Sequence, residues 1–393
     1  MATIVAQPSS PQERPGTADG EWLDVARIGP GALAGRYLRG FWQPVALASE
    51  IPVGRALPIE MVGEHFTLYR GQGGEVHAID FRCAHRGTQL STGWVEGDNL
   101  RCFYHGWVYG PDGQCVEQPA EPEPFCQRIH IGRYPVREYL GLIFAFLGEG
   151  EPPEFTRFPE MEGEGIVENS SYVRMCNYFN QLESNMDEVH VSFVHRASDF
   201  TDTGLNNDIP TITGEETEYR IVKYGHRRDQ PVRVSHFFWP NSLLIALSAG
   251  PAGISQNLAW RVPIDDARHR SFNASFLPIT GEAVERHRER QAARLKSLEG
   301  LPTSQEVTDA VLCGELHVDD LRARPDAVNV QDNVAQAGQG IIVDRSIEHL
   351  GRSDHMVAYF RRIWQRELRA LQEGRPLKQW RKTGVTLATY GAD

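Results

Sequence analysis

The stretches Cys83-Ala-His85-Arg-Gly and Cys102-Phe-Tyr-His105-Gly-Trp, with 16 residues between His85 and Cys102, decide the fold of the amino-terminal part of this chain. Each stretch offers one thiolate and one imidazole. Short apolar-alternating runs broken by Gly, Pro and Asp surround them, and Pro111-Asp-Gly113 predicts a hairpin turn. The pattern over residues 57–146 therefore predicts a small all-β module.

Two kinds of metal site compete for these four side chains. A structural zinc site usually takes a Cys pair from one loop and a His pair or second Cys pair from the other. Here both loops mix the two ligand types, which suits a [2Fe–2S] cluster with one iron on two thiolates and one on two histidines. Glycines at 87, 93, 106 and 113 allow tight turns whose N–H groups can approach bridging sulfides.

The pattern C-x-H-R-G…C-x-Y-H-G-W resembles the Rieske family very closely. The resemblance implies that Cys83, His85, Cys102 and His105 bind a Rieske [2Fe–2S] cluster. Rieske proteins of respiratory complexes carry two further loop cysteines that form a disulfide over the cluster. The matching positions here are Thr88 and Tyr104, which indicates the oxygenase and ferredoxin branch.

Composition indicates an ordinary globular protein. The 393 residues are 40% hydrophobic and 23% charged, a length that suits two domains. The net charge of -12 argues against general binding to nucleic acid or anionic membranes. The start of the chain lacks a signal-peptide pattern, and the most apolar run, 140–147, is shorter than the roughly 20 residues of a membrane helix. A cytoplasmic protein is therefore expected.

The six cysteines do not suggest a disulfide framework in a chain of this length and expected location. Beyond the two in the paired loops, the remaining four are expected to be small buried hydrophobic residues: Cys115, Cys126, Cys176 and Cys313.

Three regions are expected along the chain. Residues 1–20 predict a flexible tail, 21–150 a lead-in segment with a helix at 32–40 followed by the β-module, and 151–393 a second domain. In the second domain, many strand-like runs alternate with few helical ones, expected at 182–195, 282–298 and 355–372. The fold class is therefore α+β, an antiparallel sheet with packed helices; the resemblance implies a helix-grip arrangement.

A second group of metal-binding residue types lies in Asp187-Glu-Val-His190-Val-Ser-Phe-Val-His195. Two histidines five positions apart lie about 140° apart around an ideal helix, so they do not share one face. Both can reach one metal only if the helix is distorted or ends between them. On spacing alone, a surface helix with scattered histidines is the better interpretation.

The same segment resembles the D-x-x-H-x-x-x-x-H signature of Rieske oxygenase catalytic domains. The residues around it, Asn177-Tyr-Phe-Asn-Gln-Leu-Glu183 and Phe193-Val-His195, resemble the phthalate dioxygenase-like branch. Many other family members carry Asn where this chain has Glu183. The resemblance implies a mononuclear Fe(II) held by His190, His195 and one later carboxylate, with positions left open for oxygen.

The third ligand has several candidates. The segment from Gln331 resembles the family's carboxy-terminal segment, in which the ligand lies near the start of a helix, and this selects Asp332. Asp344, in an Asp-Arg pair, is expected to form a structural ion pair. The full set of candidates is Asp319, Asp320, Asp326, Asp332, Asp344 and Asp354.

Asp187 has a separate expected role. Three positions before His190, it lies on the same side of a helix and can accept a hydrogen bond from that ligand. The resemblance implies that it also reaches a Rieske histidine of a neighbouring subunit and links the two metal sites. Such a link requires an oligomer, for which we expect a cyclic trimer.

The resemblance covers the chain from about residue 24 and implies an enzyme, the alpha subunit of a terminal oxygenase. It would take electrons from a separate NAD(P)H-dependent reductase, directly or through a ferredoxin. With O2 it would hydroxylate, cis-dihydroxylate or oxidatively demethylate an aromatic substrate, with an aromatic carboxylate or aryl ether expected. A Rieske electron carrier, which has no use for about 240 further residues, and a zinc-containing binding protein are the alternatives.

Overall fold

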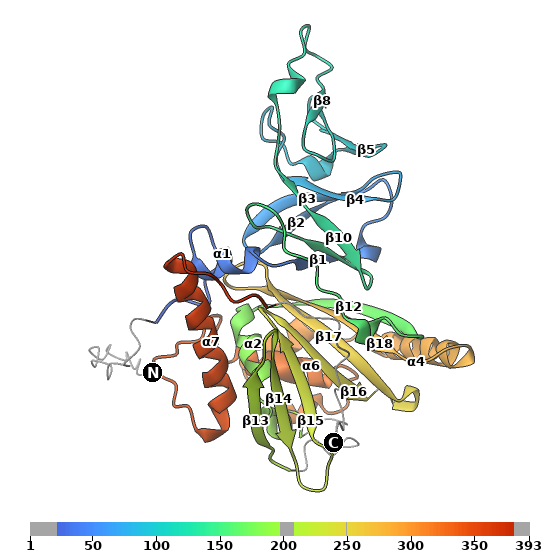
Figure 1. Cartoon of the computed structure of the whole chain (residues 1–393). Coiled ribbons are helices and arrows are strands. Elements are labelled where there is room, and N and C mark those ends of the chain that lie inside the picture. Colours follow the sequence, from blue (N-terminus) through green and yellow to red (C-terminus); the bar gives the residue numbers. More distant parts are fainter. Residues whose placement is uncertain (1–21, 197–207, 249, 381–393) are drawn as a thin grey trace, which may run out of the picture.

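The structure, a computed structural model, describes residues 22–196, 208–248 and 250–380. The predicted tail, 1–20, lies outside the described residues. Figure 1 shows an elongated molecule with a stack of small sheets at one end and a large sheet flanked by helices at the other. Among the described helices, none has both the length and the apolar character needed to cross a membrane.

The amino-terminal unit begins with helix α1 (Leu33–Arg39), which confirms the helix expected at 32–40 to within one residue at each end. Small antiparallel sheets follow. The first has the order β1-β11-β10 (Gln43–Leu47, Leu142–Ala145, Val136–Tyr139), the second β2-β3-β4-β9 (Ala56–Met61, Glu64–Arg70, Val76–Asp80, Arg133–Tyr134), and the third β5-β6-β7-β8 (Trp94–Glu96, Asn99–Arg101, Val108–Tyr109, Cys115–Glu117).

The second unit is built on one seven-stranded sheet in which every neighbouring pair of strands is antiparallel. Its order is β12-β18-β17-β16-β15-β14-β13 (Ile166–Arg174, His269–Leu277, Ile254–Pro263, Ser242–Ser248, Arg233–Phe238, Arg220–His226, Thr211–Glu216). The chain thus has the α+β fold class predicted from the sequence.

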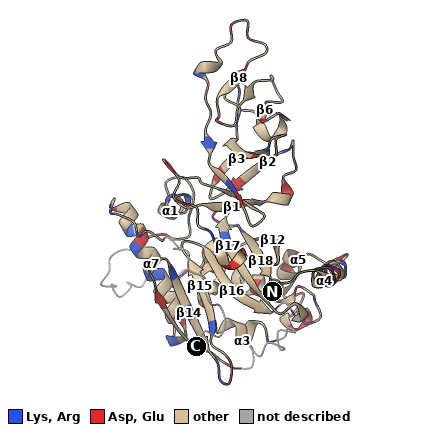
Figure 2. Cartoon of the chain, turned by 45° about the vertical axis from the view of Figure 1, so that its right-hand side comes forward, with Lys and Arg blue, Asp and Glu red and all other residues tan. Residues whose placement is uncertain are grey.

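Helices pack around this sheet. They are α2 (Tyr178–Met186), α3 (His190–Val194), α4 (Glu282–Leu298), α5 (Ser304–Leu312), α6 (Ala327–Ala337) and α7 (His355–Gln372). The predictions for α4 and α7 are confirmed at both ends. Figure 2 shows acidic and basic residues interspersed along these two helices, which fits their partly solvent-exposed position.

The prediction of a continuous helix at 182–195 is wrong. Helix α2 ends at Met186 because Asp187 adopts an extended backbone, with φ -84° and ψ 132°, and α3 begins only at His190. Helix α5 has no counterpart among the expected helices. A capping box marks its start: the Thr303 hydroxyl accepts from the Glu306 N–H at 3.2 Å, and the Glu306 carboxylate accepts from the Thr303 N–H at 2.7 Å.

One hydrophobic core runs through both units. It joins side chains of the amino-terminal sheets, such as Phe66 and Leu142, to Phe179 of α2, Trp260 of β17 and Trp364 of α7. We propose that the domain boundary lies near residue 150, between the end of β11 and the start of β12.

A second, smaller core lies at the far end of the amino-terminal unit, under the paired Cys-His loops, and includes Tyr69, Leu90 and Tyr109. The expected burial of Cys115, Cys126 and Cys176 is confirmed. The expectation for Cys313 is wrong: this side chain is exposed, because the residue directly follows α5 and faces solvent there.

Candidate metal centres and the adjoining pocket

The two Cys-His loops have the same backbone geometry. In the first loop the Gly87 N–H donates to the Cys83 carbonyl at 2.9 Å, and in the second the Gly106 N–H donates to the Cys102 carbonyl at 3.1 Å. Both glycines have a positive φ, +74° and +72°, which residues other than glycine rarely adopt. In both loops a glycine four residues after the cysteine therefore closes a matching turn.

These turns bring the four predicted cluster ligands together in two pairs. The thiols of Cys83 and Cys102 are buried, while the rings of His85 and His105 lie nearer the surface with centroids 4.5 Å apart. His85 also stacks on Trp107, with ring planes 6° apart. Its Nδ1 atom is buried and has no hydrogen-bond partner among the described residues, which fits a nitrogen reserved for a metal.

Tyr109 on β7, which the sequence did not single out, lies against one of the predicted cluster ligands. Its hydroxyl lies 3.1 Å from Cys83 Sγ and also accepts the Ala84 N–H at 3.1 Å. Because one lone pair is used by Ala84, the hydroxyl proton can point at the sulfur. Burial raises the pKa of the Cys83 thiol, and the contact with Tyr109 opposes that rise. Tyr109 can therefore stabilise negative charge on this sulfur.

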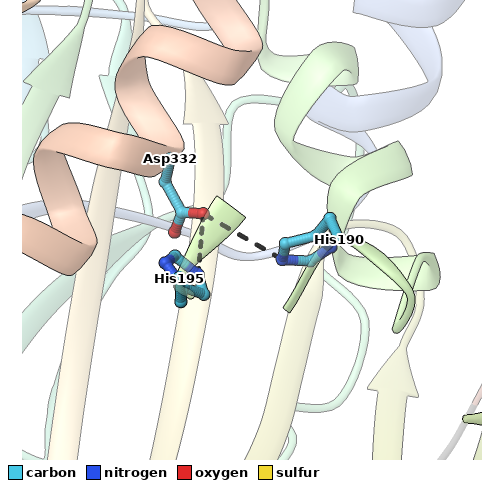
Figure 3. Close-up of side chains that lie close together, drawn as sticks. All are labelled: His190, His195 and Asp332. Carbon is cyan, nitrogen blue, oxygen red and sulfur yellow. Dashed lines mark ion pairs between the residues drawn. The ribbon is translucent and has the colours of Figure 1, made fainter. Parts of the chain in front are cut away.

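The second predicted site is also assembled, as Figure 3 shows. His190 opens α3, His195 directly follows it, and Asp332 projects from α6 towards both. Asp332 Oδ1 lies 3.3 Å from His195 Nε2 and 4.0 Å from His190 Nε2. One ligand atom from each residue lies within 4.8 Å of the other two, so the three side chains can bind one ion.

Helix α3 ends between the two histidines. His190 is its first residue and His195 is the residue after its last, with φ -96° and ψ 10°, so the two do not belong to one continuous helix with the 140° separation. Their ring centroids lie 5.8 Å apart. Of the two alternatives that the spacing left, a distorted helix or one that ends between the histidines, the structure has the second.

Local hydrogen bonds orient the ring of His195. Its Nδ1 lies 3.1 Å from Gln331 Oε1, so the proton is assigned to Nδ1 and the lone pair of Nε2 faces Asp332. Burial lowers the pKa of His195, but Asp332 and Gln331 raise it above the ordinary value. Burial likewise raises the pKa of Asp332, while His195, Arg174 and His190 lower it to about 2. Asp332 is thus ionised at neutral pH.

Asp187 contacts the other histidine. Its Oδ1 accepts the Val189 N–H at 2.8 Å, and its Oδ2 lies 3.4 Å from His190 Nδ1. Burial raises the pKa of Asp187, but His190, the Val189 N–H and Lys223 together lower it below its usual value. The Nε2 atom of His190 then faces the triad.

The structure does not bring the other carboxylate candidates to this site. Asp326 forms an ion pair with Arg324 at 2.9 Å, and Asp344 accepts the hydroxyl of Ser346 at 2.6 Å. The remaining carboxylates bind nearby turns: Asp319, Asp320 and Asp354. The expectation that Asp332 lies near the start of its helix is wrong. It is the sixth of the eleven residues of α6, which places it opposite α3.

A cavity of about 450 Å³ adjoins the triad, between the sheet and helices α2, α3 and α6. That volume is within the range of small-molecule sites. Strands of the sheet supply much of the lining. The side chains from β16 are apolar, namely Leu243, Ile245 and Leu247, and those from β12 and β17 are polar, namely Tyr172, Arg174, Asn257 and Arg261. Because these residues are spread over separate strands, no local sequence motif marks them.

A buried ion cluster lies beside the triad. The Glu188 carboxylate, 2% exposed, meets Lys223 at 3.1 Å, Arg227 at 3.1 Å and Arg233 at 2.8 Å. Burial raises the pKa of this carboxyl, but the three cations hold it well below its usual range. Glu188 belongs to the segment between α2 and α3, so the cluster ties that break to strands β14 and β15.

Known proteins share both the motifs and the fold of this chain. Residues 41–139 match the Rieske [2Fe-2S] domain family. Phenoxybenzoate dioxygenase subunit alpha of Ectopseudomonas oleovorans is 30% identical over 391 residues, covering 93% of this chain and 88% of that protein. The 5,5'-dehydrodivanillate O-demethylase oxygenase subunit of Sphingobium sp. (strain NBRC 103272 / SYK-6) is 28% identical, covering 89% of this chain and 80% of that protein.

A solved structure agrees on the fold. The reduced complex between oxygenase and ferredoxin in carbazole 1,9a-dioxygenase contains a chain that superposes with a TM-score of 0.63 at 19% identity, covering 86% of this chain and 93% of that chain. The arrangement of a Rieske module on an antiparallel sheet with packed helices is therefore that of a known terminal oxygenase.

The full-length similarity places the chain in the Rieske non-haem iron oxygenases, the family that hydroxylates aromatic rings. Within that family it is the alpha subunit of a terminal oxygenase in the phthalate dioxygenase-like branch, as the motifs predicted. It is an oxidoreductase that incorporates O2, and the alternative of a pure electron carrier is set aside.

Proposed function

We propose that His190, His195 and Asp332 hold a mononuclear Fe(II). The observation that carries the proposal is the convergence of two imidazole Nε2 atoms and one carboxylate oxygen at the wall of a cavity. This donor set is the 2-His-1-carboxylate triad of non-haem iron oxygenases. When bound, the iron would supply open coordination positions at which O2 is activated. The ionised Asp332 supplies one negative charge, which offsets part of the positive charge of the metal.

We propose that Cys83, His85, Cys102 and His105 hold the Rieske cluster. The buried thiols would bind the inner iron and the outer imidazoles the other one, since histidine ligation is confined to one iron of such clusters. The unpartnered Nδ1 of His85 supports this division.

Asp187 is proposed to position His190 and to link it to a partner subunit. Its carboxylate faces the ring nitrogen of His190 that points away from the triad, so it can hold a proton there. The link to a Rieske histidine of a neighbouring chain requires an oligomer, which we take to be a cyclic trimer in the cytoplasm.

We infer that a separate NAD(P)H-dependent reductase supplies electrons, directly or through a ferredoxin. The carbazole 1,9a-dioxygenase complex, in which a similar fold binds a ferredoxin, supports the second route.

The substrate is proposed to be an aromatic compound that fits the cavity beside the triad. The two curated relatives support two outcomes: dioxygenation, as in phenoxybenzoate dioxygenase, and oxidative O-demethylation, as in the dehydrodivanillate enzyme. A product screen with a surrogate reductase over aromatic acids, aryl ethers and N-methyl compounds tests both.

Iron and acid-labile sulfide analysis of the purified protein tests the metal assignment. We expect three irons for every two sulfides in each chain. His190→Ala should lower this to two irons for two sulfides and abolish turnover. Two irons in the unmodified protein would contradict the assignment of a mononuclear site. Zinc without sulfide would contradict the assignment of a cluster.

A further inference from the structure

Tyr172 of β12 lies in the cavity beside the triad, in line with two charged side chains of the sheet. The strand register pairs Tyr172 with Ser271 of β18, and Ser271 in turn with Arg261 of β17. Residues paired in this way share one face of a sheet, and Tyr172 and Arg261 both line the cavity. Arg174, two positions along β12, lies on that face as well, with its guanidinium 5.1 Å from the centre of the Tyr172 ring.

Both arginines beside this ring are buried. Arg174 is 2% exposed, donates to Gln336 Oε1 at 2.6 Å and lies 3.8 Å from Asp332, which connects the surroundings of the phenol to the triad. Arg261 is 8% exposed and donates to the side-chain oxygen of Asn273 at 3.2 Å. Its Nε is buried without a hydrogen-bond partner among the described residues. The phenol therefore lies beside two buried positive charges, which would stabilise a phenolate.

The hydroxyl of Tyr172 is also held by helix α2. Gln181 Nε2 donates to it at 3.2 Å, which leaves the hydroxyl proton for a partner in the cavity. Burial raises the pKa of Tyr172, but Arg261, Arg174, Ser271 and Gln181 lower it to about 8. Every other described tyrosine whose pKa is shifted is shifted upwards. A group with a pKa close to neutral is well matched to proton transfer.

The other ionisable groups that face this part of the cavity do not cancel the positive charge. His269 of β18 lies behind Gln181, and burial lowers its pKa to about 3, so its ring is neutral. Asp332 of α6 is ionised but also faces the two histidines of the triad. Asp326 has an arginine partner two positions away, and Arg294 of α4 is exposed. The charge that acts on the phenol is therefore mainly that of the two buried arginines.

We propose that Tyr172 is a catalytic proton donor, which gives its phenolic proton to the oxygen that is reduced at the triad while Arg174 and Arg261 stabilise the phenolate that remains. The inference rests on the proposed function and adds a residue to it. Hydroxylation, dihydroxylation and demethylation each consume two electrons and two protons for every O2. The reductase supplies the electrons. One proton leaves the O–H bond of Tyr172, and water that enters the cavity returns a proton to the phenolate.

Ultraviolet difference titration of the oxidised, iron-loaded oxygenase tests the proposal without turnover. A phenolate absorbs at longer wavelength than a phenol, and subtraction of the Tyr172→Phe spectrum at each pH removes the absorption of the cluster. The intact protein should show one tyrosine that ionises near pH 8, about two units below an ordinary tyrosine. Arg261→Gln removes one of the two positive charges and should move this ionisation upwards by roughly one unit.

Tyr224→Phe is the matched control. This phenol lies outside the cavity and donates to Glu215 at 3.2 Å. Its removal should leave the ionisation near pH 8 unchanged.

The pH dependence of turnover tests whether the phenol takes part in the reaction. Because the donor must be protonated, kcat with the substrate that the product screen identifies should fall about tenfold per unit above pH 8. Tyr172→Phe should be roughly hundredfold slower and should lose this fall. In Arg261→Gln the fall should move to higher pH together with the ionisation of the phenol. Tyr224→Phe should match the intact protein in rate and in profile.

Two results would overturn the inference. The first is the lack of an ionisation near pH 8 that depends on Tyr172, and the second is a Tyr172→Phe protein that turns over within about threefold of the intact protein. If Tyr172→Phe does not fold, Arg261→Gln decides, because the ionisation and the fall in kcat must shift together. Iron analysis separates this failure from that of the proposed function. Three irons per chain and turnover without either signature keep the oxygenase and reject Tyr172, whereas two irons and no turnover reject the proposed function.

Discussion

Tyr109 shows how one hydroxyl can adjust a metal site that it does not bind. It points at Cys83 Sγ from 3.1 Å, and its orientation is set by the Ala84 N–H. A hydrogen bond to a ligand sulfur favours the reduced cluster, because reduction adds negative charge that the donor stabilises. We expect Tyr109→Phe to lower the reduction potential by on the order of 20–60 mV, the equivalent of one hydrogen bond. A redox titration followed by electron paramagnetic resonance measures the shift.

Tyr69 offers a matched control for this substitution. Its hydroxyl donates to the Asp98 carbonyl at 2.9 Å in the same small core, and among the described residues it makes no hydrogen bond to a proposed cluster ligand. Tyr69→Phe should leave the potential unchanged. An unchanged potential in Tyr109→Phe, with the cluster retained, would show that the hydroxyl does not donate to the sulfur.

Asp187 lies against His190 without belonging to the triad. Asp187→Asn keeps the size of the side chain and removes its charge. The variant should retain three irons per chain yet turn over roughly tenfold to hundredfold more slowly, as is typical when a residue that orients a metal ligand is lost. Metal analysis and steady-state kinetics give the two readings. Normal turnover with full iron content would contradict the assigned role.

At the residue scale, candidate sites whose residues are close together in sequence could be predicted. Candidate sites whose residues come from separate strands could not. The four cluster ligands lie in two short turns, so spacing and residue type were enough to select them. Asp332 needed a resemblance, since six distant carboxylates were possible. Arg261 and Tyr172 reach one cavity only because β17 and β12 belong to the same sheet, and nothing in either strand alone indicates a binding site.

At the scale of elements, the break between α2 and α3 sets the position of the short helix that carries His190 and leads to His195. The buried Glu188 cluster holds that break against β14 and β15. Glu188→Ala would remove the carboxylate that pairs with three cations, of which Lys223 and Arg227 are buried, and we expect it to lower the free energy of unfolding by about 3–5 kcal/mol. Because the segment carries His190, the iron content should fall as well. Chemical denaturation and iron analysis measure the two effects.

Glu282 provides the comparison for this prediction. It forms an ion pair with Arg286 on the exposed face of α4, with its side chain 93% exposed. Glu282→Ala should change the free energy of unfolding by less than about 0.5 kcal/mol. A Glu188→Ala protein as stable as this control, with full iron content, would show that the cluster does not hold the break.

The same break explains which helices could be predicted. Helices α4 and α7 follow a regular periodic pattern to their ends, and both were found at their true boundaries. The segment 182–195 has helical residues throughout, so local propensity predicted one helix. Tertiary contacts of Glu188 with Lys223 of β14, Arg233 of β15 and Arg227, which directly follows β14, overrode that propensity. Such contacts are not visible in a local pattern.

At the scale of the whole molecule, the two candidate metal centres lie at opposite ends of one chain. Figure 1 places the loops beside β5 and β8 near one end of the molecule and α6 within the second unit, beside the large sheet. Electrons that enter at the tip would therefore have a long path to the triad within a chain. A ring of chains shortens this path if the tip of one subunit meets Asp187 of the next.

Mixed oligomers test whether the two centres cooperate between chains. Cys102→Ser should lose the cluster and keep the triad, while His190→Ala should do the opposite, and each alone should be inactive. In a cyclic oligomer assembled at random from equal amounts, each position holds a Cys102→Ser chain next to a His190→Ala donor with a probability of about one quarter. Co-expression should therefore restore about a quarter of the activity of the intact oxygenase. If oligomers contain both variants and yet remain inactive, electron transfer takes place within single chains. If sedimentation shows a monomer, the cyclic oligomer does not form.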